Sequence, residues 1–256
     1  MTVLELRGVS KTYGEGPNRV HALREVDLSV ESGVLVAVMG PSGSGKSTLL
    51  AIAGSLEDPS AGQVLVGGAP LSKMSRNAKA RLRRRSIGFV FQDFNLLAGL
   101  TAVENVSLPL ELDGVRAGRA LSIGRAALEQ LGLDDKANRY PDQLSGGERQ
   151  RVSIARAVVG KRSLLLADEP SGALDSANGE VVMRLMLAAC HRGVAAVMVT
   201  HDAHLASWAD RVVMLKDGGL VERAPGSTAP VMSGQGAATA GAPTTGSDAG
   251  RPWDRP

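Results

Sequence analysis

The chain has 256 residues, of which 43% are hydrophobic and 21% are charged. These proportions are ordinary for a globular protein, so we expect one catalytic domain with a sizeable core. The net charge of +3 is small for this length, and nucleic acid is not expected as a ligand. A single cysteine, Cys190, excludes an internal disulfide, and no secretory signal is recognisable, which favours a reducing, cytoplasmic location.

The N-terminal residues predict an antiparallel β lobe, because Val3–Leu6 and Val26–Val30 alternate between apolar and polar side chains. Further along the chain, apolar positions fall at helical spacing, with interruptions at Pro109 and Pro141. This spacing predicts a helical subdomain at about residues 93–150.

The longest apolar stretches are too short to cross a membrane. They are Val34–Met39, Leu164–Ala167 and Val194–Val199, whereas a membrane-spanning helix needs about 18 to 20 apolar residues. We interpret them as strands of a central, mainly parallel sheet, because strands covered on both faces lose the alternation of apolar and polar residues. If the protein drives a membrane process, another polypeptide must supply the pore.

A hairpin is expected at the end of the folded domain. Val212–Leu215 and Leu220–Glu222 flank the turn sequence Asp217–Gly219. We therefore predict one domain over residues 1–223. Residues 224–256 are dominated by small and polar residues and by proline, which predicts a disordered C-terminal tail.

The segment Gly40–Thr48 has the sequence GPSGSGKST, which matches the phosphate-binding pattern GxxxxGK[ST]. It lies between an apolar strand and a helix-compatible segment, the context that this motif requires. Glycines let backbone N–H groups surround a phosphate, Lys46 can reach the terminal phosphates, and Ser47 offers a hydroxyl to Mg²⁺. ATP and Mg²⁺ are therefore the expected ligands. The residues expected at the nucleotide are Gly40, Pro41, Ser42, Gly43, Ser44, Gly45, Lys46, Ser47 and Thr48.

Two carboxylates and a histidine follow strands of the same predicted sheet. Asp168 and Glu169 end an apolar strand, and parallel strands place their carboxyl ends at one edge. We expect Asp168 to hold Mg²⁺ or its water and Glu169 to polarise the attacking water. An acidic turn is the simpler alternative. His201 follows the strand Ala196–Thr200 and suits a γ-phosphate contact, although a lone histidine is more often structural.

A second anion site is expected at Leu144–Glu148, which precedes the strongly helical Arg149–Ala157. Ser145 and Glu148 form an S-x-x-E capping box, which explains a helix start but leaves the intervening glycine pair unexplained. Glycine lowers helix stability by about 1 kcal/mol relative to alanine. The pair is better explained by close approach of the backbone to an anion.

Together, the P-loop, Asp168–Glu169 and Leu144–Glu148 resemble the motifs of ABC (ATP-binding cassette) ATPases. The resemblance covers nearly all of residues 1–223. It implies an α/β P-loop ABC cassette with a central mainly parallel sheet, an N-terminal antiparallel β lobe and a helical subdomain.

The resemblance also implies roles for residues that indicate little alone. Tyr13 is expected to stack on adenine, Gln92 to bind the metal and contact the attacking water, and Asp175 to lie at a dimer contact. Without the resemblance, Tyr13 would be interpreted as a surface aromatic residue, Gln92 as a polar residue at a strand end and Asp175 as a helix cap or turn residue. The residues expected at a second copy's nucleotide are Ser145, Gly146, Gly147 and Glu148.

In this family, two cassettes pair head to tail and enclose two ATP molecules. The resemblance thus implies a homodimer in which Mg²⁺-ATP hydrolysis drives a separate integral membrane permease. Contact with the membrane would be made through that permease, at the cytoplasmic face of the cell membrane.

Further segments resemble the macrolide- and peptide-export and lipoprotein-release group. They are Arg83–Gln92, Asn95–Leu97 and Glu104–Leu110. Ser171–Asp175 departs from that group, because Ala173 stands where asparagine is usual and cannot make its hydrogen bonds.

Two alternative functions of an ABC ATPase stay open. A regulatory cassette could control an extracytoplasmic cell-wall hydrolase through a membrane partner. A non-transport ABC protein would work on ribosomes or on DNA ends, but such proteins usually carry two cassettes in one chain or a long coiled coil, and neither is recognisable here. A small-molecule P-loop kinase is a third alternative, and it leaves Leu144–Glu148 unexplained. The cluster Arg81, Arg83, Arg84 and Arg85 suits anionic headgroups or an acidic permease loop, but a solvated helix face is the simpler interpretation.

Overall fold

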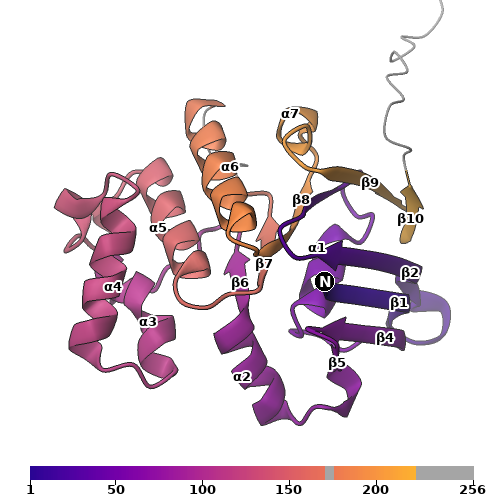
Figure 1. Cartoon of the computed structure of the whole chain (residues 1–256). Coiled ribbons are helices and arrows are strands. Elements are labelled where there is room, and N and C mark those ends of the chain that lie inside the picture. The colour runs from indigo at the N-terminus through magenta and orange to yellow at the C-terminus, as the bar shows by residue number, and fades with distance from the viewer. Residues whose placement is uncertain (171–175, 223–256) are drawn as a thin grey trace, which may run out of the picture. The chain divides into compact units, whose positions relative to one another are not determined.

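A computed structural model describes residues 1–170 and 176–222 (Figure 1). The predicted features that involve Ser171–Asp175 and residues 223–256 lie outside the described residues. The α-helices are α1 (Lys46–Ala53), α2 (Arg76–Ser86), α3 (Ala102–Leu112), α4 (Ala117–Glu129), α5 (Gly146–Val158), α6 (Ser176–His191) and α7 (Ala203–Ala206). The strands are β1 (Thr2–Tyr13), β2 (Val20–Glu31), β3 (Leu35–Met39), β4 (Ala61–Val66), β5 (Ala69–Pro70), β6 (Ile87–Val90), β7 (Leu164–Asp168), β8 (Ala195–Thr200), β9 (Arg211–Lys216) and β10 (Gly219–Glu222).

The N-terminal strands form the predicted antiparallel lobe. Strands β1, β2, β4 and β5 make a four-stranded sheet in the order β2-β1-β4-β5, with every described pairing antiparallel. Leu4, Leu6 and Val9 of β1 are buried and contribute to one core cluster. The alternation seen in the sequence therefore marks the covered face of this sheet.

The second sheet has six strands in the order β10-β9-β3-β8-β7-β6. Five of these strands run parallel, and only β10 pairs antiparallel, through the predicted hairpin with β9. The hairpin turn uses Asp217 and Gly218 at φ 49° and 81°. Both residues have positive φ, as a tight two-residue hairpin turn requires. The central, mainly parallel sheet predicted from the apolar runs is thus confirmed.

Strand β3 shows why its sequence lacks alternation. Val36 and Val38 pack into one core cluster together with α1, whereas Leu35 and Ala37 pack into another together with α6. Both faces of the strand are covered, so every position favours an apolar residue. This double burial places the end of β3, and the loop after it, on a rigid support.

Helices α3, α4 and α5 group together, away from the N-terminal strands (Figure 1). They have a core of their own, which includes Val106, Leu128 and Val152. The expected interruption at Pro109 is wrong, because α3 continues through it to Leu112. Proline removes one backbone hydrogen bond, and burial of the helix on α4 and α5 offsets that loss.

No helix among residues 1–170 and 176–222 has the length and apolar character required to span a lipid bilayer.

Candidate nucleotide-binding site

The P-loop connects the carboxyl end of β3 to α1. Gly45 caps α1 at φ 103°, and a Cβ there would lie 2.2 Å from the Ala22 carbonyl oxygen. A Cβ on Gly40 would lie 2.2 Å from the Leu215 carbonyl oxygen. Since real Cβ atoms do not approach so closely, both positions require glycine. The loop therefore presents its N–H groups and the positive end of α1 at one place, which suits phosphate oxygens.

Two side chains of the loop face this cradle. The Lys46 ammonium donates to the carbonyl oxygens of Gly40 at 2.8 Å and Pro41 at 2.9 Å. The hydroxyl of Ser44 is buried and has no hydrogen-bond partner among residues 1–170 and 176–222. Buried polar groups without partners are rare and point to an external ligand or water. The loop thus has a cation available for a bound anion, and beside it a buried hydroxyl whose hydrogen bond is unsatisfied.

Hard oxygen ligands adjoin the loop. Ser47, in the first turn of α1, lies beside the Asp168 carboxylate at the end of β7. Burial raises the pKa of Asp168 above its ordinary value, while Ser47 and nearby Lys46 oppose that shift. A hydroxyl and a carboxylate beside a phosphate cradle fit Mg²⁺, which binds few protein oxygens and completes its shell with phosphate and water. The described residues hold no group of three or more acidic, His or Cys side chains that could bind a metal alone.

Glu169 is held by the neighbouring strand β8. Its backbone has φ 44°, and its N–H donates to the Val199 carbonyl at 3.0 Å. The carboxylate Oε1 lies 2.8 Å from Nδ1 of His201, and Oε2 accepts from the Thr200 hydroxyl at 3.1 Å. The structure thus brings together Glu169 and His201, as expected from parallel strand ends. Thr200 was not predicted as a site residue, and only its position before His201 could have indicated it.

Tyr13, at the end of β1, lies in a small polar cluster. Its hydroxyl donates to Glu57 at 2.6 Å, and the Lys11 ammonium lies 5.0 Å from the ring centre. Burial and the Glu57 carboxylate raise the pKa of Tyr13, with burial the larger cause. The ring is 39% exposed, so one surface of this residue is open to a ligand. Sequence patterns gave no indication of Lys11 and Glu57, which reach the ring from different segments.

Gln92 lies exposed just after β6, and within residues 1–170 and 176–222 no hydrogen bond or ion pair of its side chain is found. The chain beyond it is constrained, because Phe94 and Asn95 have φ of 59° and 48°. Arg156 of α5 donates to the carbonyl oxygens of Phe94 at 2.9 Å and Asn95 at 2.7 Å. The segment after Gln92 is therefore hydrogen-bonded to α5, the helix whose N-cap is Ser145.

The predicted capping box at α5 is confirmed. The Ser145 hydroxyl accepts from the Glu148 N–H at 3.3 Å, and Glu148 Oε2 accepts from the Ser145 N–H at 2.7 Å. These bonds lower the pKa of Glu148. No hydrogen bond or ion pair found within residues 1–170 and 176–222 connects Gly40–Thr48 with Ser145–Glu148, and Figure 1 shows α5 apart from α1. One chain thus carries two separate helix starts that suit anions.

Three arginines of the α2 cluster, Arg83, Arg84 and Arg85, form contacts within the chain. Arg83 donates to the Ser55 carbonyl at 2.8 Å, while Arg84 and Arg85 pair with Asp113 at 3.4 and 2.5 Å. The Arg85 guanidinium is the main cause that lowers the pKa of Asp113. These contacts join α2 to the ends of α1 and α3, so the helix face is more than a solvated surface.

A phosphate cradle between a buried strand and a helix, with acidic groups on the next parallel strand, defines a P-loop nucleotide-binding protein. The family described as ABC transporter matches residues 23–172 of this chain. The chain belongs to that family, and it is an ATPase of the ABC type. Its fold is the ABC cassette fold that the sequence motifs predicted.

Curated relatives extend the match beyond those residues. An uncharacterized ABC transporter ATP-binding protein of Methanocaldococcus jannaschii is 43% identical over 220 residues, which cover 86% of this chain and 98% of that protein. The macrolide export ATP-binding/permease protein MacB of Aggregatibacter actinomycetemcomitans is 44% identical over 221 residues. That match covers 86% of this chain but 34% of MacB, so this chain spans about a third of the MacB length.

Solved structures of the cassette MJ0796 are similar to this chain over most of its length. A dimeric, post-hydrolysis state bound to ADP and Pi superposes with a TM-score of 0.79 at 40% identity, covering 86% of this chain and 98% of that one. A second dimeric structure of the same cassette gives a TM-score of 0.79 at 41% identity, covering 85% and 96%. Both the dimer and the hydrolysis products are features of that protein.

Proposed function

We propose that this chain is the ATP-hydrolysing subunit of an ABC transporter whose membrane permease exports a substrate, releases lipoproteins or remodels the cell envelope. The observation that carries the proposal is the arrangement of Ser47, Asp168 and Glu169 at the carboxyl edge of parallel strands, beside the P-loop. The names of the MacB relatives support an export role. The transported substrate would be selected by the permease.

Different residues of the chain bind the phosphates, hold Mg²⁺ and activate the water in the proposed hydrolysis of ATP. The P-loop N–H groups and Lys46 bind the terminal phosphates, and Lys46 exchanges its carbonyl partners for phosphate oxygens. Ser47, Asp168 and Gln92 would hold Mg²⁺, which supplies charge neutralisation at the phosphates. Glu169 orients and polarises the attacking water.

Other residues complete the proposed site. His201 contacts the γ-phosphate, and Tyr13 stacks on adenine. These roles agree with the open ring of Tyr13 and with the position of His201 at the end of β8.

Two copies would form each complete site. The helix start at Ser145–Glu148 is separate from the P-loop of the same chain, so it is free to meet the nucleotide of a second copy. The dimeric MJ0796 structures support this arrangement. Asp175, expected at the dimer contact, lies outside the described residues.

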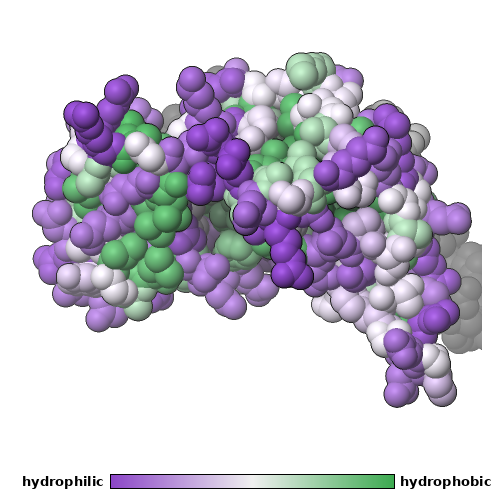
Figure 2. Space-filling model, turned by 90° about the horizontal axis from the view of Figure 1, so that it is seen from below, coloured by the Kyte–Doolittle hydropathy of each residue, from purple (hydrophilic) through white to green (hydrophobic). Residues whose placement is uncertain are grey.

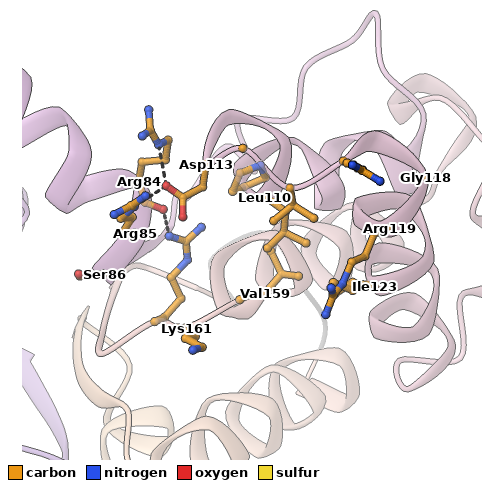
Figure 3. Close-up of a pocket in the computed structure, with 16 residues that line it drawn as sticks. Arg84, Arg85, Ser86, Leu110, Asp113, Gly118, Arg119, Ile123, Val159 and Lys161 are labelled. Carbon is orange, nitrogen blue, oxygen red and sulfur yellow. Dashed lines mark hydrogen bonds and ion pairs between the residues drawn. The ribbon is translucent and has the colours of Figure 1, made fainter.

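A cleft of about 1180 Å³ suits the membrane partner. It lies where the ends of α2 and α3 meet α4 and α5 (Figure 3), and the face seen in Figure 2 combines apolar patches with hydrophilic borders and is hollowed near its centre. The cationic side chains that line it are Arg84, Arg85, Arg116, Arg119, Lys161 and Arg162. Asp113 is the one carboxylate among the described residues that line the cleft, and Leu110 and Ile123 provide apolar surface. We propose an acidic cytoplasmic segment of the permease as its occupant.

Affinity purification tests this function. Tagged Glu169→Gln protein would be incubated with Mg·ATP and recovered from detergent-solubilised native membranes, with partners identified by mass spectrometry. Recovery of an integral membrane protein with a large extracytoplasmic domain is expected, and its loss on Arg116→Glu with Arg119→Glu would confirm the cleft. A membrane partner attached to a cell-wall hydrolase would favour the regulatory output. Recovery of ribosomal or DNA-associated proteins alone would overturn the proposal.

A further inference from the structure

Thr200 makes two hydrogen bonds at the edge of the nucleotide site. It is the last residue of β8 and is fully buried, with 0% of its surface exposed. Its hydroxyl oxygen lies 3.1 Å from Oε2 of Glu169 and accepts from the Asp202 N–H, also at 3.1 Å. A serine or threonine hydroxyl has one proton to donate. Since a carboxylate accepts only, that proton is directed at Glu169.

We propose that Thr200 is a positioning residue that fixes the Glu169 carboxylate for hydrolysis. The inference rests on the proposed role of Glu169 in polarising the attacking water. Thr200 binds Oε2 from one side, so Oε1, which His201 contacts in this structure, is the oxygen that would meet the water.

The backbone of Glu169 does not by itself fix the direction of its carboxylate. Glu169 has φ 44°, a conformation that non-glycine residues seldom adopt, and it is supported by its hydrogen bond to Val199. The side chain leaves this backbone in a direction set by the turn, with several rotatable bonds still free. A buried donor on the adjacent residue of β8 restricts those bonds. Because β8 is buried along its whole length, the donor itself is fixed.

His201 and Thr200 hold the two oxygens in different ways. The His201 side chain is 74% exposed, whereas the Glu169 side chain is 13% exposed. An exposed imidazole can turn toward a bound γ-phosphate, and this movement would release Oε1. The buried Thr200 hydroxyl has no such alternative, because its single proton is donated to Glu169 and its oxygen is held in place by the Asp202 N–H. The carboxylate would therefore keep its orientation when His201 leaves.

Substitutions at Thr200 separate the hydroxyl from the side-chain volume. Thr200→Val keeps the shape and removes the donor, whereas Thr200→Ser keeps the donor. We expect Thr200→Val to lower kcat about tenfold or more, since misplaced catalytic groups lose large factors in rate. KM for ATP should stay nearly unchanged, because the two hydrogen bonds of the Thr200 hydroxyl go to Glu169 and Asp202, which lie outside Gly40–Thr48. Thr200→Ser should restore most of the rate.

Two controls make the outcome decisive. Ser107→Ala removes another buried hydroxyl, in the helical subdomain, and should leave kcat unchanged. In a Glu169→Gln background, Thr200→Val should cause no further loss, as expected for residues that act as one unit. If Thr200→Val does not fold, Thr200→Ala compared with Thr200→Ser tests the same hydroxyl.

The results distinguish this inference from the proposed function. A wild-type kcat for folded Thr200→Val, or an equal loss in Thr200→Ser, would overturn the positioning role. A separate loss from Thr200→Val in the Glu169→Gln background would also overturn it. A Glu169→Gln protein with wild-type turnover would instead remove the proposed role of Glu169 itself.

Discussion

The ammonium of Lys46 lies 2.8 Å from the carbonyl oxygen of Gly40, the first residue of its own loop. It also donates to the Pro41 carbonyl, so the ammonium is held against the first two residues of the loop. Phosphate oxygens are stronger partners for an ammonium than neutral carbonyls. Nucleotide binding would therefore exchange these two bonds for charged ones.

We predict that Lys46→Ala weakens ATP binding at least tenfold, or about 1.4 kcal/mol. The loss follows from removal of the only cation of the loop, while the backbone cradle stays intact. Isothermal titration calorimetry with Mg·ATP measures it. Lys161→Ala, which changes a lysine of the distant cleft, is the matched control and should bind ATP like the wild type. Equal affinity of the two variants would contradict the role of Lys46.

Glu169→Gln should bind ATP normally and hydrolyse it at least about a hundredfold more slowly. The amide oxygen can still accept from Thr200, so the site keeps its shape while losing the basic oxygen. The protein should then accumulate as an ATP-bound dimer, at twice the 26.5 kDa chain mass by light scattering after size exclusion. A monomer with Mg·ATP present, at concentrations that saturate the site, would count against the paired arrangement.

Local patterns predicted the parts of the site that consecutive residues define. The P-loop, the strand ending in Asp168, the capping box and the hairpin at Asp217 each depend on a few neighbouring positions. The residue types and their spacing are therefore sufficient to predict these local structures and the groups that they expose.

Contacts between distant segments could not be read in this way. Thr200 meets Glu169 across 31 positions, and Glu57 meets Tyr13 across 44. Both contacts depend on which strands and loops become neighbours in the folded domain. Pro109 is a related case. The proline alone predicts that a helix ends near it, but packing of α3 on α4 and α5 stabilises the helix through this position.

Ser145→Arg should abolish turnover while the chain stays folded. A large cation at the start of α5 would block the second copy's nucleotide and remove the cap, which costs about 1 kcal/mol. Thr101→Arg is a close control, since Thr101 forms the same capping box with Glu104 at α3. It should lose similar stability and keep its ATPase rate. Equal loss of turnover in the two variants would attribute the effect to helix capping instead.

Acid should destabilise both capped helices. Hydrogen bonds to Thr101 and Ser145 lower the pKa values of Glu104 and Glu148 below their ordinary 4.5. A carboxyl with a lowered folded-state pKa stabilises the protein fully above its unfolded value and loses that contribution as pH falls. Urea unfolding between pH 6 and pH 3 should therefore show falling stability. Glu104→Gln with Glu148→Gln keeps the capping geometry and should show a shallower slope; an unchanged slope would contradict this assignment.

Asp168 should behave in the opposite sense, because burial raises its pKa. A raised folded-state pKa means that the carboxyl's contribution to stability is lost as pH rises through that value, so the buried ionised carboxyl destabilises the folded state at higher pH. Asp168→Asn removes this charge at nearly the same side-chain volume, and it should raise Tm without nucleotide. The wild type should gain about 2.7 kcal/mol from Mg·ATP at a hundred times Kd, and the variant should lose most of that gain at the same concentration. Thermal unfolding with and without Mg·ATP measures both effects. A variant that is less stable alone, yet equally stabilised by Mg·ATP, would show that Asp168 serves the fold and not the metal.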